Sequence, residues 1–239
     1  MDKIIIENVS KSYKDVKALD NINLEILGNQ ITGLLGTNGA GKSTLIKILT
    51  GEIKPDSGTI SIFGIDIKNI DEIRKIVNVS PQESAIVPNL TVYENLEFFE
   101  HLYGINDAKL IDDIMTLFNL TEFKNKRSKT LSGGYKRRLS IAISLITRPR
   151  ILFLDEPTLG LDIIARRDLW HIITKISEST TIVLTSHYLE EIESLCDDVI
   201  ILSKGHLKAT GSVKDIKEIS GCNSFEDAFI KIVGESDEI

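Results

Sequence analysis

One stretch of nine residues, 36–44, limits this chain to a small set of folds, because it fits a phosphate-binding loop at every fixed position. It reads GTNGAGKST and matches the pattern G-x-x-x-x-G-K-[ST]. An apolar run at 31–35 before it is typical of a buried strand, and residues 42–49 are typical of the start of a helix. A strand, this loop and a helix in that order are the context that gives the pattern its meaning. We therefore expect an α/β fold whose loop holds phosphate groups.

The residue types in this loop explain why phosphate would bind there. Gly36, Gly39 and Gly41 allow tight turns, so that successive N–H groups point into one concavity at the positive end of a helix. Lys42 adds a point charge for terminal phosphates, and the Ser43 hydroxyl suits Mg²⁺. The alternative, a glycine-rich turn that binds nothing, is disfavoured by the length of the match. The predicted phosphate-binding residues are Gly36, Thr37, Asn38, Gly39, Ala40, Gly41, Lys42, Ser43 and Thr44.

The composition disfavours several classes of protein. The 239 residues carry a net charge of −7, which disfavours binding to nucleic acid, so no nucleic-acid partner is expected. The two cysteines, Cys196 and Cys222, form no C-x-x-C motif and argue against a zinc site or a disulfide framework. No run approaches the roughly 18 apolar residues that a membrane span needs. We therefore expect a cytoplasmic protein in which any membrane role depends on a partner.

The order of expected elements predicts a parallel sheet interrupted by a helical insertion. Runs typical of strands occur at 4–9, 22–26, 31–35, 58–64, 76–79, 151–154, 181–184, 199–202 and 207–209. Expected helices include one that Thr91 and Glu94 begin with a capping box, one at 108–118, one after Gly134, and others at 165–176 and 188–195. Alternating strands and helices imply an α/β core, made of 1–88 and 149–239, with 89–148 as a helical insertion.

Polar side chains that follow expected strands are candidates for chemistry, because ligands of open α/β sheets lie at the carboxyl ends of strands. Asp155 and Glu156 follow one apolar strand. Asp155 is placed to hold Mg²⁺ beside Ser43, and Glu156 to position or deprotonate an attacking water. His187 and Gln82 each follow another strand, and Gln82 is within reach of the metal or the water. Taken singly, each of these residues also fits an ordinary structural or surface role.

Three other features are weaker when taken alone. Ser132, Gly133 and Gly134 open a helix and form a candidate second anion site, although Ser-Gly-Gly is common in turns. Tyr13 follows the first strand, where its ring can stack on a base, and a plain surface residue is the alternative. The basic run 124–138 is interpreted as a solvated helix face in preference to a surface that attracts phosphate.

Together these motifs resemble the ATPase subunit of an ABC transporter, and the resemblance covers essentially the whole chain. A series of motifs in the family's order is far more specific than any one of them. In that order they are the adenine-stacking loop at Tyr13, Walker A at 36–44, the glutamine loop at Gln82, the signature at 131–135, Walker B at 151–155, the catalytic glutamate Glu156, the D-loop at 160–162 and the switch histidine His187. The resemblance implies an α/β P-loop NTPase (RecA-like) fold: a parallel-sheet core, a small antiparallel β part and an inserted α-helical subdomain.

The resemblance also implies ligands and a second copy. ATP and Mg²⁺ would bind at Walker A, with Ser43, Gln82 and Asp155 near the metal and His187 near the γ-phosphate. Two copies would meet head to tail, so that each ATP lies between Walker A of one copy and the signature of the other. Asp162 would help to bridge the copies. Two separate anion sites on one chain agree with a nucleotide shared in this way.

Within the family, the chain resembles exporter ATPases for drugs, antibiotics or bacteriocins. The similarity lies in LSGGYKRRL at 131–139, HYLEEIESLCDD at 187–198 and FEDAF at 225–229. In that group the ATPase is a separate chain, so an integral-membrane permease is an implied partner that would hold it at the inner face of the cell membrane. We expect the docking face within 83–103. Apolar residues near this face are Val87, Pro88, Leu90 and Val92.

Three departures from the family pattern leave the residues needed for hydrolysis in place. Thr37 and Ile163 stand where proline is usual, and Tyr135 stands where glutamine or methionine is usual. Two alternatives remain. A soluble ABC-type ATPase acting on ribosomes or nucleic acid is disfavoured by the single ATPase unit, the absence of a heptad run and the acidity. An importer ATPase shares the chemistry and is disfavoured by the short C-terminus and the signature sequence.

Overall fold

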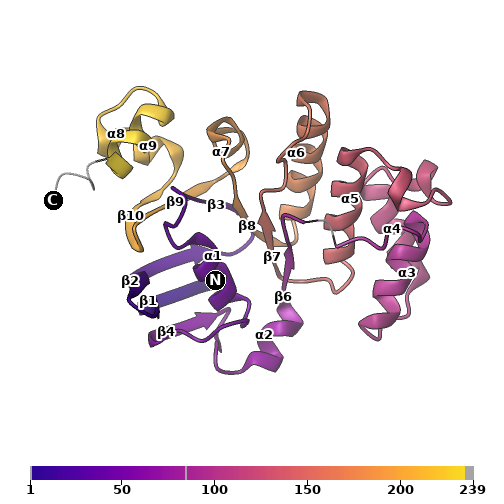
Figure 1. Ribbon diagram of the computed structural model, residues 1–239, viewed down its shortest axis with the longest axis horizontal. Coiled ribbons are helices and arrows are strands. Elements are labelled where there is room, and N and C mark those ends of the chain that lie inside the picture. Colours follow the sequence, from indigo (N-terminus) through magenta and orange to yellow (C-terminus); the bar gives the residue numbers. More distant parts are fainter. Residues whose placement is uncertain (1, 84, 235–239) are drawn as a thin grey trace.

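The computed structural model describes residues 2–83 and 85–234, whose strands form two sheets (Figure 1). One sheet has four strands in the order β2-β1-β4-β5, and the other has six in the order β10-β9-β3-β8-β7-β6. The strands are β1 Lys3–Tyr13, β2 Val16–Leu27, β3 Ile31–Gly36, β4 Ser57–Ile62, β5 Ile65–Asp66, β6 Val77–Ser80, β7 Ile151–Asp155, β8 Thr181–Thr185, β9 Asp198–Ser203 and β10 His206–Gly211.

The larger sheet confirms the predicted α/β core. Strands β3, β6, β7, β8 and β9 run parallel, and β10 pairs antiparallel with β9. Alternate residues of one strand enter two different cores. Ile151 and Phe153 of β7 pack with the antiparallel sheet, whereas Leu152 and Leu154 pack with helices on the opposite face. Burial on both faces is why these strands are apolar throughout rather than alternating.

The helices cover the larger sheet and extend beyond it at both ends. In Figure 1, α3, α4 and α5 gather at one end of the molecule, and α8 and α9 lie at the other. The helices are α1 Lys42–Leu49, α2 Ile70–Ile76, α3 Val92–Leu102, α4 Ala108–Leu117, α5 Gly133–Ser144, α6 Ile163–Ser177, α7 Leu189–Leu195, α8 Val213–Ser220 and α9 Phe225–Gly234, with short 3₁₀ turns at Thr121–Phe123 and Ser128–Thr130. Within the described residues, no helix is both long and apolar enough to cross a membrane.

The start of α3 shows how local sequence sets a helix boundary. The Thr91 side chain accepts a hydrogen bond from the Glu94 N–H, and the Glu94 carboxylate accepts one from the Thr91 N–H. This reciprocal capping confirms the predicted box and satisfies two backbone donors that the helix leaves unpaired. Asn95 then bonds to the carbonyls of Val87, Leu90 and Thr91, which ties the incoming loop to the first turn.

The interpretation of the basic run 124–138 as a solvated face is wrong for its last two residues. Arg137 and Arg138 are each only 6% exposed, and α5 is buried from Arg137 to its end at Ser144. This helix packs between α3 and α6 and contacts β6, so tertiary contacts override the polar composition. It also begins at Gly133 rather than Tyr135.

Candidate functional site

A cavity of about 430 Å³ lies where several parallel strands end. Walker A follows β3, Asp155 ends β7, His187 lies just beyond β8, and Gln82 lies just beyond β6. Because these strands are parallel, their carboxyl ends meet at one edge of the sheet. The residues that line the cavity are Val16, Ala18, Asn38, Gly39, Ala40, Gly41, Lys42, Ser43, Thr44, Gln82, Asp155, Glu156 and His187.

The Walker A loop has backbone conformations that favour glycine. Gly39 and Gly41 have φ of 79° and 106°. A Cβ on Gly41 would lie 2.5 Å from the carbonyl oxygen of Ala18, so a side chain there would collide with β2. A Cβ on Gly39 would meet nothing within 4 Å, which leaves that side of the loop open. Gly41 is also the N-cap of α1, so the loop delivers its N–H groups to a helix N-terminus.

The Lys42 side chain folds back onto the Walker A loop. Its ammonium group donates hydrogen bonds to the carbonyl oxygens of Gly36, at 2.7 Å, and Thr37, at 3.2 Å. Burial lowers the pKa of Lys42, and the carboxylates of Glu156 and Asp155 oppose that shift by favouring the cation. The site therefore places a partly desolvated cation beside the positive end of α1, which suits a polyphosphate.

A threonine that the sequence did not single out connects the two acids. The Thr185 hydroxyl, at the end of β8, donates to Asp155 Oδ1 at 2.6 Å and accepts the Glu156 N–H at 3.0 Å. Its position after a parallel core strand is the same signal that identified His187. Glu156 has φ of 49°, a left-handed conformation that costs free energy for a residue other than glycine and persists only where the surroundings impose it.

Glu156 and His187 contact each other in the cavity lining. Glu156 Oε1 lies 3.2 Å from His187 Nε2, and Glu156 is 7% exposed. Burial raises the pKa of Glu156 and the nearby Asp155 carboxylate raises it further, while His187 and Lys42 act in the opposite sense. A carboxylate whose pKa is raised toward the working pH is a better proton acceptor than an exposed one.

The donors present suit Mg²⁺. Ser43, Gln82 and Asp155 line the same cavity and offer a hydroxyl, an amide and a carboxylate oxygen. Mg²⁺ prefers such hard oxygen ligands in small number, with substrate phosphates and waters completing its shell. The three residues predicted as metal ligands are thus brought together beside Lys42.

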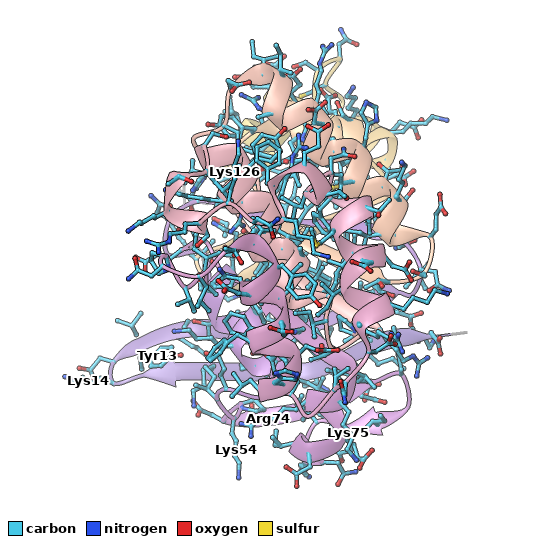
Figure 2. The ribbon with its side chains drawn as sticks, turned by 90° about the vertical axis from the view of Figure 1, so that its right-hand side faces the viewer. Tyr13, Lys14, Lys54, Arg74, Lys75 and Lys126 are labelled. Carbon is cyan, nitrogen blue, oxygen red and sulfur yellow. The ribbon has the colours of Figure 1, made fainter. Side chains whose placement is uncertain are left out.

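Tyr13 lies outside the lining of this cavity among the described residues. It is the last residue of β1 rather than part of a loop, pairs with Val16 across the hairpin, and is 47% exposed. Figure 2 shows Tyr13 and Lys14 on the hairpin that projects from the body of the molecule. Val16 and Ala18 of β2, which sequence reasoning missed, lie in the cavity wall instead.

The signature and the D-loop also lie outside that lining, on two adjacent helix N-termini. Ser132 is the N-cap of α5, although in the described part of the chain its side chain makes no capping hydrogen bond. Asp162 caps α6 by accepting from the N–H groups of Ile164 and Ala165. A Cβ on Gly134 would lie 3.2 Å from that of Ala165, so the glycine lets the helices approach closely.

A buried acid behind His187 was also missed. Glu191 of α7 is fully buried and accepts a hydrogen bond from Trp170 Nε1 at 2.9 Å. Burial raises the pKa of Glu191, whereas side-chain hydrogen bonds from Ser186, Trp170 and Thr158 act to lower it. The residue fixes α7 against α6 directly after the histidine. Its position four residues after His187 was visible in the sequence, but its burial was not.

Comparison with known proteins agrees with this geometry. The family model described as ABC transporter matches residues 19–159. Linearmycin resistance ATP-binding protein LnrL of Bacillus subtilis (strain 168) is 36% identical over 88% of this chain and 69% of its own length. ATP-binding cassette sub-family A member 2 of Homo sapiens is 39% identical over 91% of this chain, which spans only 9% of that protein.

Solved structures show the same architecture. A solved ATP-binding subunit of an ABC transporter is 27% identical, with a TM-score of 0.84 over 96% of this chain and 98% of its own. A dimeric ATP-binding cassette in a post-hydrolysis state, bound to ADP and Pi, is 26% identical, with a TM-score of 0.76 over 87% of this chain and 98% of its own. The chain therefore belongs to the ABC transporter family, and it is an ABC-type ATPase domain.

Proposed function

We propose that this chain hydrolyses ATP as one half of a head-to-tail pair that drives a separate membrane permease. The observation that carries the proposal is the cavity at the strand ends, in which Lys42, Ser43, Asp155, Glu156 and His187 meet while the signature stays outside. One copy thus holds the groups for phosphate, metal and water. The signature, the proposed second anion site, lies outside this cavity lining in the described structure, and another copy would bring it to a nucleotide.

The positions of these residues support a role for each. The Walker A N–H groups and Lys42 bind the β- and γ-phosphates. Ser43 and Asp155, with Gln82 nearby, would hold Mg²⁺, which would supply positive charge to spread the phosphate charge. Glu156 would accept a hydrogen bond or a proton from the attacking water. His187, whose Nε2 lies 3.2 Å from Glu156 Oε1, would lie beside the γ-phosphate.

The signature is the part of the proposed dimer that can be tested directly. We expect Ser132→Arg to abolish the ATP-dependent dimer of a Glu156→Gln background while leaving ATP binding by the monomer intact. The larger side chain would occupy the place of the partner's nucleotide, and the Ser132 side chain makes no capping bond in the described structure whose loss would unfold α5. Molar mass by light scattering, with and without ATP, measures the effect.

Ser179→Arg is the matched control, because Ser179 is an exposed serine just beyond the far end of α6. The dimer should persist in it. A Ser132→Arg protein that still dimerised with ATP would contradict the head-to-tail arrangement.

The permease partner is proposed from the exposed face of α3. Phe98, Leu102 and Tyr103 are 47%, 65% and 48% exposed, although they are large and apolar. They lie within the expected docking segment 83–103, of which Ser84 is outside the described residues. Val92, expected near the docking face, is fully buried and belongs to the core instead. Clustered exposed apolar side chains mark interaction surfaces.

An exporter of drugs, antibiotics or peptides is the function we propose for the assembled transporter. The exporter-like sequence segments support it, as does the similarity to a protein named for linearmycin resistance. In this arrangement the chain would be held at the cytoplasmic face of the membrane by its permease.

Charging the α3 face should separate the ATPase from its permease. ATP-bound Glu156→Gln, used as bait, should recover a multi-span protein from detergent-solubilised native membranes. The same bait carrying Phe98→Glu and Leu102→Glu should lose that protein, because two carboxylates would replace buried apolar contacts. Soluble ATP binding should be unchanged. The readout is the recovered permease per mole of bait.

Ile219→Glu is the control, since Ile219 is 70% exposed on α8 at the opposite end of the molecule (Figure 1). Equal recovery by the α3 variant and the control would refute docking at this face. Recovery of ribosomes or nucleic acid in place of a permease would favour the soluble alternative.

A further inference from the structure

Arg137 is a buried cation outside the group of residues assigned to phosphate, metal and water. It lies on α5, one turn after the signature glycines, and is 6% exposed. In the part of the chain that the structure describes, its hydrogen bonds all go to backbone carbonyl oxygens. A guanidinium presents five N–H donors in a rigid plane, so it can bind several acceptors at once.

The acceptors flank Glu156 on both sides. Arg137 Nε donates to the carbonyl oxygen of Pro157 at 3.0 Å, and an Nη donates to that of Asp155 at 2.7 Å. One guanidinium thus spans the residues before and after Glu156. Since Glu156 has φ of 49°, the chain must be held at this point from both sides. The Thr185 hydroxyl holds the N–H of Glu156 itself, at 3.0 Å.

The same side chain reaches the glutamine loop. Its other Nη donates to the carbonyl oxygens of Pro81 and Gln82. Gln82 lines the nucleotide cavity, whereas Arg137 belongs to the helix that begins at the signature. A single residue therefore joins the signature helix, the glutamine loop and the backbone around Glu156.

We propose that Arg137 is a positioning residue that holds Glu156 in its left-handed conformation and couples it to the signature helix and the glutamine loop. The inference rests on the proposed function, because it assigns Glu156 the role of orienting water. A movement of the signature helix would therefore be transmitted through the Arg137 guanidinium to the backbone on both sides of Glu156. A lysine could not replace it, since one ammonium cannot reach the three backbone segments together.

The test compares two neighbouring arginines. Arg138 has the same exposed fraction, 6%, but its guanidinium pairs with Asp168 on α6 at 2.8 Å. We expect Arg137→Gln to lower kcat for ATP hydrolysis about 10- to 100-fold with little change in KM, as misplacement of a catalytic group does. Arg138→Gln, with a comparable loss of thermal stability, should keep a kcat close to that of the wild type.

A double-mutant cycle distinguishes positioning from general damage to the fold. If Arg137 acts through Glu156, Arg137→Gln should slow single-turnover hydrolysis in the wild type but add no further loss in a Glu156→Gln background. Arg137→Lys keeps a buried cation and should show the same lowered kcat with unchanged KM, which secures the test if Arg137→Gln does not fold.

Two results would overturn the inference: equal losses of kcat in the Arg137 and Arg138 variants, or an undiminished effect of Arg137→Gln when Glu156 is already Gln. Wild-type kcat in Glu156→Gln would instead refute the proposed function. The failure of either idea is therefore recognisable from the same set of proteins.

Discussion

Glu156→Gln is expected to bind ATP and to form the dimer with almost no turnover, with kcat lower by about 10²- to 10⁴-fold. The amide keeps the size of the side chain and can still donate or accept a hydrogen bond, but it cannot take a proton from water. Glu156 lies outside the phosphate loop, so the affinity for ATP should change little. Steady-state hydrolysis, together with equilibrium binding of a fluorescent ATP analogue, separates the two effects.

The pH profile of the wild type belongs to the same experiment. Burial and Asp155 raise the pKa of Glu156, so activity that needs its carboxylate should fall, as the pH is lowered, at a higher pH than for an ordinary glutamate near 4.3. Glu190→Gln is the control, because the Glu190 side chain is 68% exposed on α7. Near-wild-type kcat in Glu156→Gln would remove Glu156 from its assigned role.

Local sequence was sufficient to predict those parts of the molecule whose conformation is set locally. The helix expected at 42–49 is α1, Lys42–Leu49, because the glycine-rich loop determines where it begins. The box at Thr91 and Glu94 likewise sets the start of α3. The clustering of Gln82 and His187 followed from a general rule, that parallel strands end at one edge of the sheet. Such a rule predicts which residues lie near one another without any knowledge of how their side chains pack.

Tertiary packing accounts for what was missed. Nothing in the spacing of α2, Ile70–Ile76, distinguishes so short a helix from a loop. The helices α8 and α9 pack on each other and on β10, which local sequence does not reveal. Arg137 is buried because it donates to backbone carbonyl oxygens that are distant in the sequence. The pattern of charged residues in the sequence does not reveal these partners. The role of Tyr13 in stacking on a base stays a prediction, whereas the position of Val16 in the cavity wall was missed.

Lys42→Ala should have the opposite effect to Glu156→Gln, because it lowers the affinity for ATP rather than the turnover. The ammonium lies at the loop, bonded to the carbonyl oxygens of Gly36 and Thr37, and faces the carboxylates of Asp155 and Glu156. Charge-assisted hydrogen bonds to phosphate contribute about 3 kcal/mol, so the Kd for ATP should rise roughly 100-fold. Without this cation, the two carboxylates would also repel the incoming phosphates.

Lys47→Ala provides the matched control for charge, since Lys47 is exposed on the same helix but lies outside the cavity lining in the described structure. Its Kd for ATP should stay close to that of the wild type, measured by titration with Mg²⁺ present. Equal Kd values for the two lysine variants would mean that net charge, and not the position of Lys42 in the loop, governs binding. A raised Kd in Lys42→Ala and a lowered kcat in Glu156→Gln would assign phosphate binding and water activation to different residues of one cavity, since each variant would leave the other's step intact.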